Sequence, residues 1–236
     1  MRIHAWTLLL VSVFVGCGAY RVDSALVEAA VQEDSDSDPA RSSAPAQTAT
    51  AQKAMAKKTM DVDPKSIEFK DRVKSNVKVP KGLEDLVFVD THGSRVALKS
   101  YQGKKNVILV FTEGFDGMLC PFCKTQTSRL IANYDKFKER DTEVLVVYPG
   151  TRDHIDEFIN AALKTEKKQL DKVPFPIVLD EDFVATDFFA IRSRHAHPST
   201  YVIDKNGDVR LAYVGTDMSA DRPSVKAILE TLDSVN

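Results

Sequence analysis

The sequence lacks the residues that a complete zinc site or a nucleic-acid-binding surface would need. It has only three cysteines in 236 residues, and neither a second Cys-x-x-Cys pair nor a spaced histidine pair accompanies Cys120 and Cys123. Lysine and arginine together number 32 against 34 aspartates and glutamates, which gives a net charge of −2. This balance offers no basic excess for nucleic acid. No internal repeat is present, and the composition fits one globular domain with appendages.

Apolar runs long enough to span a bilayer comfortably are also missing at the N-terminus. The run from Ala5 to Val15 is short and follows one basic side chain, which predicts a secretory signal over residues 1–19. The stretch 14–17, Phe-Val-Gly-Cys, resembles the bacterial lipobox, in which the cysteine, here Cys17, becomes lipid-modified. Ordinary cleavage near Ala19 and an uncleaved anchor are the alternatives. We therefore expect an exported protein of the periplasm or cell envelope, attached to the membrane through its N-terminus.

Large apolar residues are scarce in the segment that follows the signal. Residues 20–81 contain an Asp-Ser repeat and then a tract rich in Ala, Ser, Thr, Gln and Pro. Such a composition cannot bury a core, so we predict a disordered linker over 20–81 and a folded domain over 82–236.

The domain is organised around an apolar run, 107–111, that leads through a glycine-containing loop to Cys120-Pro121-Phe122-Cys123. The run predicts a buried strand, and the apolar spacing after Cys120 predicts a helix that continues through Phe137. Cys120 stands at the N-cap position of this helix, and Pro121 at the first helical position. The strand therefore delivers two thiols to a helix N-terminus.

This position has a chemical consequence for the two thiols. Because the N–H groups and dipole of a helix N-terminus favour a negative sulfur, we expect Cys120 to be the more acidic thiol and the nucleophile in disulfide exchange. Cys123 would then resolve the mixed disulfide. Glu113 and Asp116 are candidate proton acceptors beside the thiols. This redox interpretation requires no cofactor, and metal binding and an inert structural pair remain the alternatives.

The remaining patterns predict an α/β fold. Strand patterns at 86–89 and 96–98 form an N-terminal hairpin, and continuous apolar runs at 144–148 and 177–179 are typical of strands covered on both faces. Helical spacing covers 155–163, and an Asn-Gly turn joins two further strands before a helix opened by Pro223. Alternating strands and helices that close with a hairpin predict a three-layer α/β/α sandwich with a mixed central sheet.

These motifs together resemble the thioredoxin superfamily. The strand leading into Cys-Pro-Phe-Cys, Pro198 and the hairpin with Tyr-Val-Ile-Asp-Lys-Asn-Gly carry the resemblance, which is greatest to the alkyl hydroperoxide reductase/thiol-specific antioxidant branch, the redoxins and peroxiredoxins. The resemblance implies a thioredoxin-like fold with Cys120 and Cys123 as the redox centre. It also implies that Pro198 is a cis-proline facing the thiols, and that Pro198, Phe122 and His197 contact the substrate.

The sequence departs from this family at several positions. Peroxiredoxins carry Pro-x-x-x-Thr-x-x-Cys, but Glu113 and Gly117 stand at the proline and threonine positions, and the family's arginine near Pro198 is missing. We therefore favour a thiol–disulfide oxidoreductase, with a protein disulfide as substrate and a separate reducing partner. A thiol peroxidase acting on peroxides is the second hypothesis. A copper-handling protein, in which His197 joins the two thiols, is the third.

Overall fold

The structure, a computed structural model, describes residues 62–164, 171–216 and 219–235. The predicted signal, the lipobox cysteine Cys17 and the linker from 20 to 61 lie outside these residues. In the part of the chain that is described, no helix is long and apolar enough to cross a membrane.

A seven-stranded sheet forms the centre of the fold, with the strand order β2-β1-β5-β4-β3-β6-β7. β4 pairs in parallel with both β3 and β5, and the other pairings, including that of β1 with β2 in the N-terminal hairpin, are antiparallel. The sheet is therefore mixed, as the sequence predicts. Its strands are β1 (Val87–Asp90), β2 (Arg95–Ala97), β3 (Asn106–Phe111), β4 (Thr142–Pro149), β5 (Ile177–Asp180), β6 (Ser199–Ile203) and β7 (Val209–Val214).

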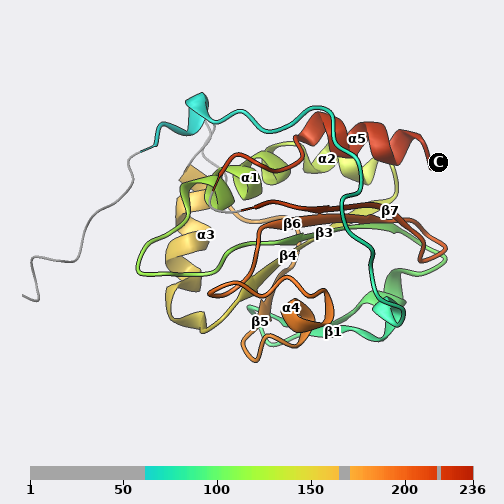
Figure 1. Cartoon of the computed structure of the whole chain (residues 1–236), viewed down its shortest axis with the longest axis horizontal. Helices are drawn as coiled ribbons and strands as arrows, with labels where there is room; N and C mark the ends of the chain where they lie inside the picture. The colour runs from blue at the N-terminus through green and yellow to red at the C-terminus, as the bar shows by residue number, and fades with distance from the viewer. Residues whose placement is uncertain (1–61, 165–170, 217–218, 236) are drawn as a thin grey trace, which may run out of the picture. The chain divides into compact units, whose positions relative to one another are not determined.

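Helices cover both faces of this sheet (Figure 1). One layer packs its buried side chains against one face and consists of α1 (Pro121–Ala132), α2 (Tyr134–Lys138), α3 (Ile155–Lys164) and α5 (Val225–Asp233). The other, thinner layer contains α4 (Val184–Phe188) and the short 3-10 helices η2 (Leu83–Asp85) and η3 (Leu98–Tyr101). Two further 3-10 helices are η1 (Pro64–Ser66) and η4 (Arg152–His154). The predicted three-layer α/β/α sandwich is confirmed.

Strand β3 is covered on both faces, which explains why its sequence after Asn106 is apolar. Ile108 and Val110 face the layer that contains α1, whereas Val107, Leu109 and Phe111 face the thinner layer. Every residue of β3 is buried, as expected for a strand with a helical layer on each side. Its C-terminal end is therefore held firmly where the loop toward the thiols begins.

Two predictions need correction. The predicted long helix is two helices, because the backbone of Asn133 leaves helical geometry at φ −113°, where its N–H and its side-chain amide both donate to the Arg129 carbonyl. The linker predicted to run to residue 81 ends earlier, since residues 62–81 lie on the domain. Ile67 and Phe69 are buried there, at 3% and 9% exposure, and this apolar contact orders a segment that is otherwise polar.

Candidate active site

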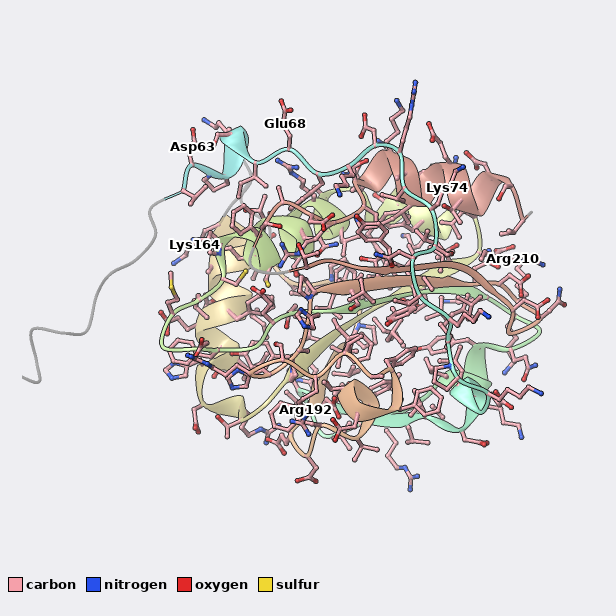
Figure 2. All side chains as sticks on the ribbon, viewed as in Figure 1. Asp63, Glu68, Lys74, Lys164, Arg192 and Arg210 are labelled. Atoms are coloured by element: carbon pink, nitrogen blue, oxygen red, sulfur yellow. The ribbon has the colours of Figure 1, made fainter. Side chains whose placement is uncertain are left out.

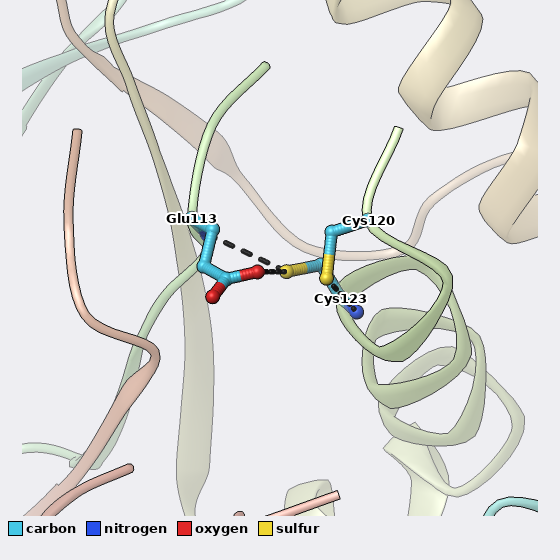
Figure 3. Close-up of side chains that lie close together, drawn as sticks. All are labelled: Glu113, Cys120 and Cys123. Atoms are coloured by element: carbon cyan, nitrogen blue, oxygen red, sulfur yellow. Dashed lines mark hydrogen bonds between the residues drawn. The ribbon is translucent and has the colours of Figure 1, made fainter. Parts of the chain in front are cut away.

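The two thiols lie at the N-terminus of α1, as the sequence predicts. Cys120 is the N-cap, Pro121 is the first helical residue, and the backbone N–H of Cys123 donates to the Cys120 sulfur over 3.3 Å. Both cysteines are free thiols, and each is only 2% exposed. The structure therefore presents a reduced, buried dithiol (Figure 3).

Glu113 reaches this pair from the loop that follows β3. Its backbone N–H donates to the Cys123 sulfur over 3.4 Å, and its carboxylate lies 3.8 Å from the same sulfur (Figure 3). The side chain of Glu113 is 13% exposed, so the carboxylate keeps a narrow path to water. Of the two predicted proton acceptors, Glu113 is at the thiols. Asp116 instead forms an exposed ion pair with Arg194 at 2.6 Å.

A buried arginine completes the site, and the sequence analysis missed it. The guanidinium of Arg222, just before α5, lies 3.3 Å from the Cys123 sulfur and 3.7 Å from the Cys120 sulfur. It also lies 3.8 Å from the Glu113 carboxylate, and Arg222 is 1% exposed. No local pattern marks Arg222 in the sequence, because the thiols it contacts are about a hundred residues away.

These contacts separate the pKa values of the two thiols. Burial opposes ionisation of Cys123, but the hydrogen bond from Cys120 and the charge of Arg222 outweigh it and lower the pKa of Cys123. The hydrogen bond to Cys123 and burial together raise the pKa of Cys120. For the resting pair, these contacts favour the Cys123 sulfur as the site of negative charge, the reverse of the order expected from the helix position alone, and the role of Cys120 as nucleophile stays a prediction. The helix N-terminus acts on both sulfurs, and the charge of Arg222, which lies closer to Cys123, adds to the hydrogen bond from Cys120 in favouring an anion on Cys123.

The loop from β3 to Cys120 is shaped by close packing at Gly114. Gly114 has φ +76°, and a Cβ at this position would lie 2.5 Å from the carbonyl oxygen of Pro149 and 3.3 Å from His195. Only glycine fits, so the loop passes directly against the end of β4. His195 therefore packs in the wall of this loop.

The residues predicted to contact the substrate are placed in different ways. Phe122 is half-buried in the first turn of α1, and its ring lies 5.8 Å from the guanidinium carbon of Arg222. Pro198 is buried next to Ser199, which pairs with Phe111 at the end of β3, so Pro198 lies at the same edge of the sheet as the thiols.

The cis-proline prediction is wrong, because no peptide bond in the described residues is cis. The trans form is the more stable form of an X-Pro bond by roughly 0.5–1 kcal/mol. In this trans arrangement the Pro198 carbonyl accepts a hydrogen bond from Gly215 over 2.8 Å, while His197 donates its backbone N–H to Ile191.

The possible ligands for a metal ion are Glu113, Cys120 and Cys123, whose ligand atoms lie within 4.8 Å of one another. His197 is not in this group, so the structure does not assemble the Cys-Cys-His set of the copper hypothesis. The guanidinium of Arg222 already contacts both sulfurs and would repel a cation. The geometry favours a thiolate paired with arginine over a metal site.

The chain matches known proteins over the same region that forms this fold. The sequence model of the AhpC/TSA family matches residues 76–212. The thiol-disulfide oxidoreductase ResA of Geobacillus kaustophilus is 28% identical over 149 residues, covering 63% of this chain and 76% of that protein. Alkyl hydroperoxide reductase C of Mycolicibacterium smegmatis is 27% identical over 148 residues, covering 62% and 70%.

Solved structures agree with the fold. The mitochondrial 2-Cys peroxiredoxin of Plasmodium falciparum superposes with a TM-score of 0.54 at 21% identity, covering 67% of this chain and 94% of that one. Peroxiredoxin Q of Xanthomonas campestris superposes with a TM-score of 0.51 at 18% identity, covering 69% and 99%. These superpositions support a thioredoxin-like, peroxiredoxin-type fold.

Proposed function

This chain belongs to the AhpC/TSA family, whose members named above are oxidoreductases that act on disulfides or peroxides, and on that premise we propose that it is a thiol–disulfide oxidoreductase with Cys120 and Cys123 as its redox pair. One observation carries the proposal. Two free thiols at a helix N-terminus share contacts with a buried arginine and a carboxylate. A positive charge stabilises a thiolate at neutral pH, and the carboxylate can accept a proton.

In the first step of the proposed reaction, Cys120 attacks a disulfide of the substrate protein. A bond forms between the Cys120 sulfur and one substrate sulfur, the substrate disulfide breaks, and the other substrate sulfur leaves as a thiolate that takes a proton from water. The proton of Cys120 passes to the Cys123 thiolate, to which Cys120 is hydrogen-bonded. Cys120 is the attacking group because Cys123 is enclosed by Glu113, Arg222 and Cys120.

In the second step, Cys123 releases the substrate. Glu113 accepts the Cys123 proton over their 3.8 Å contact, the Cys123 sulfur bonds to Cys120, and the mixed disulfide breaks. The released substrate sulfur takes a proton, so the substrate gains two electrons and two protons while the enzyme pair becomes a disulfide. A separate reducing partner must then restore the dithiol.

Reduction of insulin with dithiothreitol as donor tests this proposal. The full chain should accelerate insulin reduction over dithiothreitol alone, and the Cys120→Ser/Cys123→Ser double variant should not. The wild-type full chain should consume hydrogen peroxide no faster than an unactivated thiol does. An insulin reduction rate equal to that of the double variant would refute the assignment.

One observation favours a second candidate, a thiol peroxidase. Arg222 supplies a cation at the thiols, which the sequence analysis found missing near Pro198. Such a cation could stabilise the charge that develops when a thiolate cleaves a peroxide O–O bond. Rapid, saturable peroxide turnover that requires Cys120 and falls in Arg222→Met would favour this candidate over the disulfide reductase.

We also propose that the protein is exported and tethered to the membrane. The support is the apolar run of the N-terminus and its lipobox-like stretch ending in Cys17. Metabolic labelling with a fatty-acid analogue should mark the wild type and not Cys17→Ser. Absence of label from both proteins, in a cell with working lipoprotein export, would exclude lipidation at Cys17.

A further inference from the structure

An ordered segment before the domain crosses the molecule and ends beside the last strand. We call this segment, residues 64–76, the strap; it runs over α1 and α5 in Figure 1. At its start, Arg129 of α1 donates to the carbonyl oxygens of Pro64 and Ile67 over 3.2 and 2.6 Å. Ile67 and Phe69 point into the domain, whereas Glu68 points outward (Figure 2).

The end of the strap lies along β7, which would otherwise be an open sheet edge. The backbone N–H of Asn76 donates to the Ala212 carbonyl over 3.0 Å, and its side chain makes two hydrogen bonds to the backbone of Val214. The strap is therefore anchored at both ends, on α1 and on β7.

Between these anchors, the backbone of Lys70 bonds to the residues on both sides of Pro223, of which Arg222 is one. The backbone N–H of Lys70 donates to the Arg222 carbonyl over 2.8 Å, and the Lys70 carbonyl accepts from the N–H of Ser224 over 2.9 Å. These two bonds flank Pro223 as a parallel bridge. Asp71 adds a bond of 2.6 Å from the Ser224 hydroxyl, at the N-cap of α5.

The side chain of Lys70 holds the residue before Arg222. Its ammonium group lies 2.5 Å from the Asp221 carboxylate and donates to the Tyr213 hydroxyl over 2.9 Å. The Tyr213 hydroxyl in turn donates to the same carboxylate over 2.5 Å. The Asp221 side chain is 17% exposed and that of Lys70 51%, so the carboxylate is largely shielded from solvent and the ammonium group stands at the surface.

Arg222 needs such support, because a buried guanidinium is costly to keep away from water. Its Nε atom is buried and has no hydrogen-bond partner among the described residues. Without restraint on its backbone, the Arg222 side chain would gain hydration by rotating toward solvent. The sulfurs of Cys120 and Cys123 would then no longer contact a positive charge.

We propose that the strap holds Arg222 against the two thiols, and that Lys70 is a positioning residue for their chemistry. The inference deepens the proposed function, on which it rests, by linking the redox pair to the segment that enters the domain. Cys120, Arg222 and Glu113 are the charged or titratable groups that act on the pKa of Cys123, whose own charge adds to burial in raising the pKa of Tyr148. Lys70 acts on the thiols through Arg222.

The test measures thiol ionisation in the full chain, with Cys17→Ser as background so that only Cys120 and Cys123 react. The rate of alkylation by iodoacetamide across pH gives the first pKa of the pair. Arg222→Met should raise this pKa by about 1–3 units, because it removes a cation next to the thiolate. Lys70→Met should raise it by a part of that shift, and Lys70→Arg, which can keep the bond to Asp221, should restore it.

A double-mutant cycle separates positioning from a direct charge effect. If Lys70 acts through Arg222, Lys70→Met should cause no further shift in the Arg222→Met background. The matched control is Arg140→Met, which breaks an ion pair of 2.6 Å with Asp233 and should leave the thiol pKa unchanged. Tyr213→Phe removes a bond to Asp221 without changing charge and should shift the pKa in the same direction as Lys70→Met.

Two outcomes would overturn the inference. One is an unchanged thiol pKa in Lys70→Met and Tyr213→Phe. The other is a Lys70→Met shift that persists in full when Arg222 is absent. If Lys70→Met fails to fold, the thiol pKa of Tyr213→Phe tests the inference in its place, measured both in the single variant and in combination with Arg222→Met. Since alkylation requires no partner protein, these results are independent of whether the chain reduces insulin.

Discussion

The guanidinium of Arg222 lies 3.3 Å from the sulfur of Cys123, although the two residues are 99 positions apart in the chain. This contact favours a negative charge on the Cys123 sulfur. The helix N-terminus stabilises an anion on either sulfur, but the shorter distance from Arg222 to Cys123 and the N–H of Glu113 favour that sulfur. These contacts favour the charge on Cys123, and we propose that Cys120 attacks the substrate.

The two single cysteine variants should differ in their titration. In Cys120→Ser, Cys123 keeps both Arg222 and the N–H of Glu113, so a thiol with a pKa below the free value of about 8.5 should persist. In Cys123→Ser, the remaining thiol lies 3.7 Å from Arg222, so its pKa should be higher. Alkylation across pH measures both values. Loss of the acidic titration in Cys120→Ser would place the charge on the outer sulfur.

The same variants should differ in trapping a substrate. Cys123→Ser keeps the attacking sulfur and lacks the resolving one, so mixed disulfides with protein substrates should accumulate and survive non-reducing electrophoresis. Cys120→Ser should trap almost nothing, because Cys123 is enclosed by its neighbours. Equal trapping by both variants would contradict the assignment of Cys120 as nucleophile.

Glu113→Gln should have two opposite effects. Removing the carboxylate charge should lower the thiol pKa values, because the Glu113 charge raises the pKa of both cysteines. Loss of the proton acceptor should slow resolution of the mixed disulfide, on the order of 100-fold. Stopped-flow resolution rates and alkylation give the two readouts. Asp116→Asn, in the same loop but paired with Arg194, should change neither, and a Glu113→Gln enzyme that resolves at the wild-type rate would exclude proton transfer to Glu113.

The sheet and the thiol helix could be predicted from the sequence because their signals are local. β3 and β4 each contain a continuous apolar run, and Pro121 after Cys120 marks a helix start. The Asn-Gly turn likewise fixed the hairpin of β6 and β7.

The rest of the site depends on contacts between distant segments, which local patterns do not encode. Arg222 reaches the thiols only because Lys70 and the start of α5 hold its backbone. The strap was assigned to the linker because its composition is mostly polar, although Ile67 and Phe69 are apolar residues that could pack on the domain edge. Both are buried, and hydrogen bonds to Arg129 and to β7 add to their contact. The break at Asn133 was also missed by the sequence analysis, because the helical spacing of apolar residues continues across it.

Two glycines of the loop from β3 to Cys120 provide a matched pair for a packing test. Gly114 and Gly117 have similar φ angles of +76° and +72°, so Ala at either should cost about 1–2 kcal/mol of backbone strain. A Cβ at Gly117 meets nothing within 4 Å, whereas at Gly114 it would lie 2.5 Å from the Pro149 carbonyl. Gly114→Ala should therefore lower the free energy of unfolding by roughly 1–3 kcal/mol more than Gly117→Ala. Equal losses in urea denaturation would show that the loop moves aside freely.

Asp204 should contribute strongly to stability through the turn between β6 and β7. Its side chain is 4% exposed, and it accepts hydrogen bonds from the backbone N–H groups of Asn206 and Asp208 and from the Arg210 guanidinium. Asp204→Ala should lower the free energy of unfolding at pH 7 by about 2–3 kcal/mol, because three donors lose a buried, charged acceptor. Asp208→Ala is the control. Its carboxylate is 70% exposed and 3.7 Å from Arg210, so the loss should stay below about 1 kcal/mol.

The pH dependence of this effect distinguishes the charge of Asp204 from its shape. Burial raises the pKa of Asp204, but the bonds from Arg210 and the two N–H groups outweigh burial, so the folded-state pKa lies below the ordinary value of 3.8. A lowered pKa means that the stabilisation is complete above the unfolded-state pKa of about 3.9 and is lost as the pH falls through the folded-state value. The difference in unfolding free energy between wild type and Asp204→Ala should therefore be constant from pH 7 to about pH 5 and shrink below about pH 4. A difference that stays constant into strong acid would mean that Asp204 stabilises the turn by packing rather than by its charge.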